Sequence, residues 1–101
     1  MDIVRSVAGV PVRLTEERWA HILVGHPELT NDRTAMLVAL EHPQSVMTGR
    51  DGVLLAVRPV DDRKWIVVAY VENDATDGFV LTAYLTRRDP TRGRETAWSP
   101  S

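Results

Sequence analysis

The sequence predicts an α+β fold in which two N-terminal helices pack on a four-stranded antiparallel meander sheet. Helical periodicity is confined to residues 15–42, strand-like alternation follows over residues 45–86, and short turns separate the successive strands. At 101 residues the chain has the usual length of one domain. We therefore expect residues 1–101 to form a single domain with an irregular basic tail over residues 87–101.

Two helices are predicted, each ended by a proline. The first covers residues 15–26, where Thr15 is a good N-cap and two glutamates occupy the first turn. Its apolar stripe consists of Trp19, Ile22, Leu23 and His26. Pro27 restricts the preceding residue and ends this helix. The second helix covers residues 31–42 and stops before Pro43.

Four strands are predicted after the helices, at residues 45–48, 53–58, 64–72 and 79–86. Residues 2–7 and 10–14 also alternate, as a short hairpin or as one bent edge strand. In the last strand, alternation places Phe79, Leu81, Ala83 and Leu85 on the core face and Val80, Thr82, Tyr84 and Thr86 on the opposite face. We expect the helices to cover the core face.

The strand register decides which polar side chains meet. If Glu72 opposes Gly78 across the last hairpin, Thr86 lies opposite Lys64. If Arg58 also opposes Lys64 across the preceding turn, then Arg58, Lys64 and Thr86 form one row beside the tyrosine of the last strand. Two like charges directly opposite each other are unfavourable unless an anion lies between them. The row therefore predicts a phosphate site.

Composition narrows the classes of function. The net charge of −2 argues against bulk electrostatic binding of nucleic acid, and the absence of cysteine excludes disulfides and thiolate chemistry. No apolar run has the length of a membrane span or the form of a secretory signal, so we expect a cytoplasmic protein. The four arginines between residues 87 and 94 are either a solvated tail or a local contact for a phosphate backbone.

The chain has three histidines, which could serve as metal ligands or as acid–base groups. His21 points away from the apolar stripe, so it is either a solvent-facing side chain or a functional one. His26 lies at a helix end, where it either satisfies a carbonyl and packs on the core or acts in a site. His42 has the same setting and is expected to be structural. A spacing of five does not place His21 and His26 on one helix face, so no metal site is expected.

The remaining candidates also have ordinary structural explanations. Tyr84 and Thr86 are common strand residues, but they lie on the non-core face at the strand end nearest the arginines. Arg58 is a surface charge or a phosphate contact. Trp98 either attaches the C-terminal tail to the domain, which we favour, or offers a surface for base stacking.

An ordered series of segments resembles a known superfamily over roughly residues 12–98. The segments are Arg13-Leu14-Thr15, Arg18-Trp19-Ala20-His21-Ile22, His26-Pro27-Glu28, Leu54-Leu55-Ala56-Val57-Arg58, Lys64-Trp65-Ile66-Val67-Val68, Asp77-Gly78-Phe79-Val80, Thr82-Ala83-Tyr84-Leu85-Thr86-Arg87-Arg88 and Trp98. Together they resemble the phage- and toxin-associated branch of the Barnase–EndoU–colicin–RelE nuclease superfamily.

The resemblance implies a metal-independent, cofactor-free endoribonuclease of toxin type. Members of this superfamily cleave RNA by attack of the ribose 2′-hydroxyl on the adjacent phosphate, which requires a base, an acid and cations. We expect His21 or His26 to share the proton transfers with Tyr84, and Thr86 to donate a hydrogen bond. The phosphate-binding candidates are Arg58, Lys64 and Arg87.

The resemblance also implies partners. RNA is the expected substrate, and a neutralising antitoxin or immunity protein is the expected protein partner; we also allow for a homodimer. The alternative is a catalytically inactive module on the same fold that binds RNA or a protein. The acidic balance of the chain favours this alternative, whereas the set of histidines and hydroxyls favours the nuclease.

Overall fold

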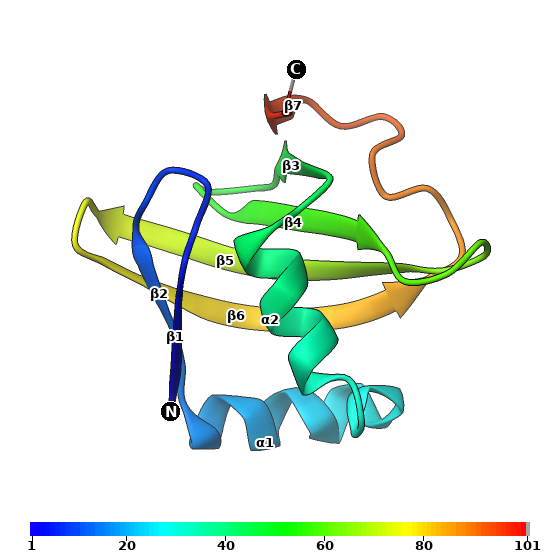
Figure 1. Ribbon diagram of the computed structural model, residues 1–101, viewed down its shortest axis with the longest axis horizontal. Coiled ribbons are helices and arrows are strands. Elements are labelled where there is room, and N and C mark those ends of the chain that lie inside the picture. The colour runs from blue at the N-terminus through cyan, green and yellow to red at the C-terminus, as the bar shows by residue number, and fades with distance from the viewer. Residues whose placement is uncertain (101) are drawn as a thin grey trace.

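The chain folds into an α+β structure in which two helices pack on a seven-stranded, mostly antiparallel sheet (Figure 1). The computed structural model describes residues 1–100. Its elements are β1 (Asp2–Arg5), β2 (Pro11–Leu14), α1 (Glu16–Gly25), the 3-10 turn η1 (Pro27–Leu29), α2 (Arg33–Glu41), β3 (Ser45–Thr48), β4 (Leu54–Pro59), β5 (Trp65–Asp74), β6 (Asp77–Thr86) and β7 (Thr96–Trp98). No helix within residues 1–100 is long and apolar enough to cross a membrane.

Both helices are confirmed, and their caps explain where they end. The Thr15 hydroxyl accepts a hydrogen bond from the Arg18 N–H at 3.0 Å, so it caps α1 as expected. The His26 N–H closes the last turn of α1, and Pro27 redirects the chain into η1. The second helix is shorter than residues 31–42, because Asp32 and His42 have non-helical backbone conformations on either side of it.

The meander is confirmed, but the sheet is larger than four strands. Strands β3, β4, β5 and β6 pair antiparallel in sequential order, and β1 and β2 form the hairpin. This hairpin joins the sheet through a short parallel pairing of Val12 with Gly78 and of Arg13 with Phe79. At the other edge β7 pairs with β3. Both additions join segments far apart in the sequence, which short-range periodicity does not reveal.

A bulge in β6 makes the predicted register wrong beyond the first residues of the hairpin. Glu72 does oppose Gly78, but the register shifts between the Ala69 and Tyr70 pairs. One extra residue on β6 therefore moves every later residue by one position. Thr86 consequently opposes Trp65 and not Lys64, and Tyr84 opposes Val67 and not Ile66.

The same bulge changes which residues of β6 face the helices. Val80, Ala83 and Leu85 belong to the main core, which lies between the sheet and α2, whereas Leu81 packs with the apolar cluster on the opposite sheet face. The prediction that Phe79, Leu81, Ala83 and Leu85 share the core face is therefore wrong for Leu81 and for Phe79, which is absent from the main core, and Val80 is core rather than outward-facing. Thr82, Tyr84 and Thr86 alternate on the outer face as expected.

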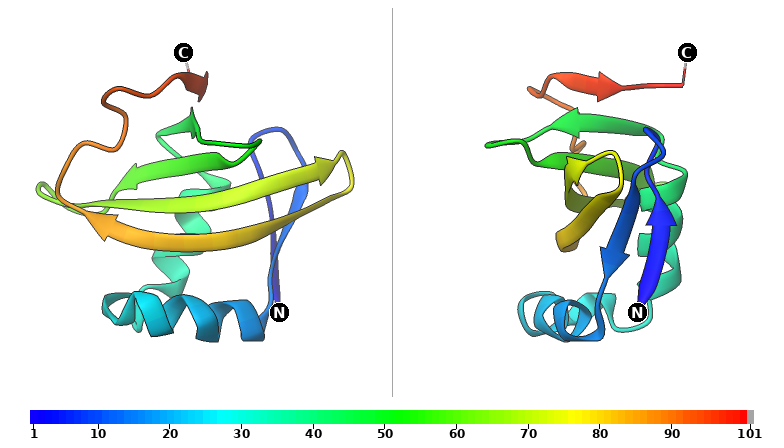
Figure 2. Two further views of the ribbon diagram at one scale, coloured as in Figure 1. Left: turned by 180° about the vertical axis from the view of Figure 1, so that it is seen from behind. Right: turned by 90° about the vertical axis from the view of Figure 1, so that its left-hand side faces the viewer.

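The helices occupy different positions relative to the sheet. The view from behind in Figure 2 shows β4, β5 and β6 with no helix across them. α2 crosses the other face, and α1 runs along the β6 side of the sheet (Figure 1). α1 contacts β6 and η1. One side of this helix therefore stands beside the sheet face that no helix covers.

An ion cluster joins the N-terminal strand to both helices. The Arg33 guanidinium donates to the Asp2 carboxylate at 2.8 Å and to both carboxylate oxygens of Glu16, at 2.7 and 2.8 Å. Hydrogen bonding to Arg33, together with the Met1 amino group, lowers the pKa of Glu16 to about 2. Glu16 also lies in the first turn of α1, where a negative charge is favourable.

Glu16 therefore predicts a pH-dependent contribution to stability. Its folded pKa lies below its ordinary value of 4.5, so the contribution is complete above that value and disappears as the pH falls towards about 2. Glu16→Gln should lower the melting temperature at pH 7, and the difference from wild type should vanish near pH 2. Thermal unfolding followed by circular dichroism between pH 2 and 7 measures this. Glu17→Gln, one residue along, is the control; an equal effect there would contradict the assignment.

Candidate functional site

A shallow groove runs between α1 and the bulged part of β6. It has a volume of about 290 Å³ and is lined by Arg18, His21, Ile22, Val24, Gly25, His26, Leu81 and Thr82. We call it the α1–β6 groove. Two further hollows adjoin it and share Arg18, one lined by Thr15, Glu17, Arg18 and His21 and the other by Arg13, Thr15, Arg18, Phe79 and Val80. The depression therefore extends along the length of α1.

Arg18 is common to all three hollows and is half-buried. Its Nη1 donates a hydrogen bond to the Leu81 carbonyl oxygen at 3.4 Å, at the bulge. A guanidinium has five N–H donors in a fixed fork. Among the hydrogen bonds within residues 1–100 the Arg18 side chain makes this one, which leaves most of its donors for an anion in the groove.

His26 lies at the far end of the groove, next to Tyr84. The two ring centroids are 6.1 Å apart, with the ring planes tilted by 33°. Nδ1 of His26 is 3.4 Å from a Glu28 carboxylate oxygen, a contact that orients the imidazole. His26 is thus both the C-cap of α1 and half-exposed to the groove, so its structural and functional explanations are compatible.

Tyr84 has a fixed position on the outer sheet face. It pairs with Val67, which is fully buried, and packs against the outer apolar cluster while remaining half-exposed. Thr82, two residues earlier on the same face, lines the groove. β6 therefore presents a hydroxyl, and beyond it a phenol, beside the imidazole of His26.

His21 lines the groove one turn after Arg18 and is exposed. Its side chain makes no hydrogen bond or ion pair within residues 1–100. The sequence left a solvent-facing and a functional explanation open, and the geometry is compatible with both. His21 and His26 share one groove even though a spacing of five places them on different helical faces.

The predicted row of Arg58, Lys64 and Thr86 does not form. Arg58 opposes Ile66, one of the main-core residues, and its Nη1 donates to the His42 carbonyl oxygen at 2.6 Å. It therefore lies on the helix side of the sheet, opposite to Tyr84. Lys64 precedes β5 and pairs with neither residue. The bulge and a β4–β5 turn that lies one residue later than predicted together remove this row.

The other candidates occupy the ends of elements. The Thr86 hydroxyl accepts a hydrogen bond from the Arg88 N–H at 3.1 Å, which shapes the turn after β6. Arg87 follows directly and is exposed. His42 is an exposed C-cap with Nε2 2.9 Å from the Glu41 carboxylate, in agreement with the structural role expected for it. Trp98 packs on the main core and attaches the tail through β7, as predicted.

Arg13, beside the groove, is already neutralised. Its guanidinium forms a two-pronged ion pair with Asp77, at 2.9 and 3.1 Å. Hydrogen bonds from the Asn73 amide and from Arg13 lower the pKa of Asp77. Arg18, which has no acidic partner within residues 1–100, is therefore the groove cation best placed to meet a negative ligand.

Sequence reasoning did not single out Arg18, although the spacing contained a signal for it. Arg18, His21 and Gly25 lie at i, i+3 and i+7, so they share one face of α1. That face lies beside the apolar stripe and becomes the wall of the groove. What the sequence did not show is that β6 lies opposite this wall.

Comparisons with protein-family models, with curated proteins and with solved structures found no match to the chain. Within residues 1–100, no three His, Asp or Glu side chains are grouped closely enough to hold a metal ion.

Proposed function

We propose that the α1–β6 groove is the active site of a metal-independent endoribonuclease of toxin type. One observation carries the proposal: an imidazole and a phenol adjoin at one end of a groove that also holds an arginine without an acidic partner. This set supplies two proton-transfer groups and one cation for a phosphate. The proposal also draws on the resemblance to the Barnase–EndoU–colicin–RelE superfamily, which implies helices that precede an antiparallel meander.

Each group has a role in cleavage through the ribose 2′-hydroxyl. His26 removes the proton from the 2′-hydroxyl, whose oxygen then bonds to the adjacent phosphorus. The bond from phosphorus to the 5′-oxygen breaks, and Tyr84 protonates that oxygen as it leaves. Arg18 neutralises the charge that develops on the non-bridging oxygens. His21, in the same groove, is the second candidate for the base.

The cation role is tested by RNA binding with Arg18→Ala. Loss of one phosphate contact should weaken binding and reduce the slope of log affinity against log salt concentration by about 1. Fluorescence anisotropy of a labelled single-stranded RNA at several salt concentrations measures both. Arg50→Ala removes an exposed charge from the β3–β4 turn and is the matched control.

Equal affinities and slopes for Arg18→Ala and wild type would contradict the proposed phosphate contact. Binding that depends on Arg18 without any RNA cleavage would favour the inactive RNA-binding module. If the protein cleaves RNA, we expect a neutralising protein partner to cover the α1–β6 groove.

A further inference from the structure

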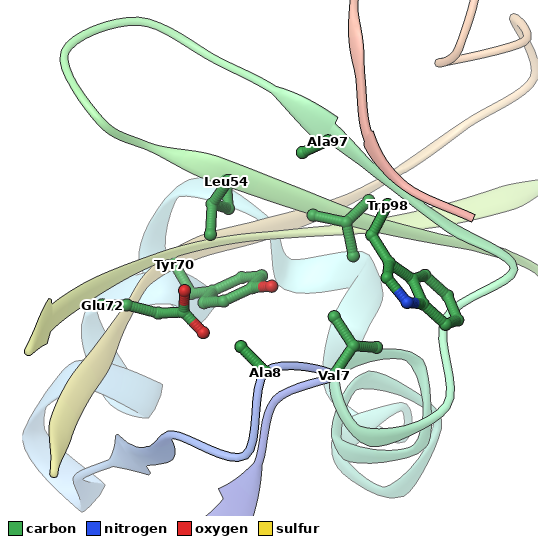
Figure 3. A pocket seen from close by; sticks show the side chains of 8 residues that line it. Val7, Ala8, Leu54, Tyr70, Glu72, Ala97 and Trp98 are labelled. Atoms are coloured by element: carbon green, nitrogen blue, oxygen red, sulfur yellow. The ribbon is translucent and has the colours of Figure 1, made fainter. Parts of the chain in front are cut away.

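A second pocket lies on the other side of the molecule, between the β1–β2 loop and β7 (Figure 3). It has a volume of about 260 Å³ and is lined by Val7, Ala8, Val46, Leu54, Tyr70, Glu72, Ala97 and Trp98. It shares no residue with the α1–β6 groove. Seven of its eight lining residues are apolar or aromatic without a charge, so the pocket walls favour an apolar ligand body.

The Tyr70 hydroxyl points into this pocket without a partner. The Tyr70 side chain is 1% exposed, yet its ring ends at the pocket surface (Figure 3). No group within residues 1–100 forms a hydrogen bond with the hydroxyl, and because no side-chain polar atom in this part of the chain is both buried and unsatisfied, the hydroxyl is accessible from the pocket. Burial raises the pKa of Tyr70, and the nearby Glu72 raises it further, so the hydroxyl stays protonated. The hydroxyl is therefore free to donate a hydrogen bond to a ligand in the pocket.

Glu72 gives the pocket a charge preference. One of its carboxylate oxygens accepts a hydrogen bond from the Ser6 hydroxyl at 2.5 Å, which fixes the side chain at the pocket. Within residues 1–100 no Lys, Arg or His forms an ion pair with it. A carboxylate beside apolar walls is most favourably matched by a cation.

We propose that this pocket binds a small organic cation: an amine carried on an apolar body of about one ring. A cavity of roughly 150 Å³ is enough for a benzene ring, so the volume accommodates such a body together with an ammonium group. The ammonium group pairs with Glu72, the Tyr70 hydroxyl forms the second hydrogen bond, and the ring packs against Trp98. Trp98 also offers an aromatic face to the cation.

The test uses three probes of equal size and different charge: phenethylamine, 2-phenylethanol and phenylacetate. Titration calorimetry gives the affinities, and ¹H–¹⁵N spectra follow the indole N–H signals of the three tryptophans. We expect phenethylamine to bind at least tenfold more tightly than the alcohol, with the Trp98 signal shifting and those of Trp19 and Trp65 unchanged. Trp98→Phe assigns the signal.

Two variants separate charge from packing. Glu72→Gln retains the bond to Ser6 and should reduce phenethylamine affinity at least tenfold, to the level of the alcohol. Asp62→Asn removes an exposed charge in the β4–β5 turn and should leave the affinity unchanged. Tyr70→Phe should weaken both the amine and the alcohol several-fold, and thermal unfolding checks that each variant is folded. Absence of saturable amine binding to wild type, equal affinities for amine and alcohol, or an unchanged Glu72→Gln would each overturn the proposal.

Discussion

Replacing His26 with alanine is expected to lower the rate of RNA cleavage by about 10²- to 10⁴-fold, the usual contribution of one general acid or base. The expectation rests on the imidazole's position beside Tyr84 and in the groove that holds Arg18. Single-turnover cleavage of a labelled RNA, in the presence of a chelator, measures the rate. Since His26 also caps α1, unfolding is measured on the same protein.

His42→Ala is the matched control for this substitution. Both histidines are C-caps of a helix, both precede a proline, and both face a glutamate carboxylate. Their local structural effects should therefore be similar, while only His26 lies in the groove. Equal losses of cleavage rate in the two variants would contradict a catalytic role for His26. Tyr84→Phe keeps the ring contact and removes the proposed acid, so it should also slow cleavage without loss of stability.

Gly78→Ala is expected to destabilise the fold by about 1–3 kcal/mol, the usual cost of overpacking a core. A Cβ atom at Gly78 would lie 2.6 Å from the Val71 carbonyl oxygen, and 3.3 Å from a Val12 methyl group. Gly78 is where β6 pairs with β5 on one side and with β2 on the other, so neither neighbour can retreat without breaking a pairing. Urea unfolding monitored by tryptophan fluorescence measures the change.

Gly25→Ala is the control for this stability prediction. At Gly25, the last residue of α1, an added Cβ has no atom within 4 Å, and the φ angle is not positive. Alanine there should be neutral or stabilise by about 0.5–1 kcal/mol, because it reduces the freedom of the unfolded chain. A Gly78→Ala protein as stable as Gly25→Ala would contradict the close packing of β2, β6 and β5.

The local elements were predictable because their signals are local. Thr15 and Pro27 define α1 through a cap and a steric restriction, and the turns between the strands follow from residues that favour them. The prediction failed at longer range. The β2–β6 and β3–β7 pairings are non-local, and a bulge leaves no clear mark in an alternating sequence.

In the candidate site, too, the residues chosen from local signals were found and those that depend on long-range pairing were not. His26 and Tyr84 were both selected from their positions at a helix end and on an outer strand face, and the fold brings them together. Arg58 was selected from an assumed register, and the bulge-free pairing that this required does not occur. Arg18 was missed because its importance depends on the Leu81 carbonyl opposite it, a tertiary contact.

The most direct test of the proposed activity is the chemistry of the product ends. The protein is incubated with a mixed pool of single-stranded RNA in excess chelator, and the fragments are identified by mass spectrometry. Attack by the 2′-hydroxyl predicts 2′,3′-cyclic phosphate and 5′-hydroxyl ends, and no cleavage where a single 2′-deoxy residue replaces the nucleotide at the cut site. Fragments with 5′-phosphate and 3′-hydroxyl ends, or an RNA pool left intact, would contradict it.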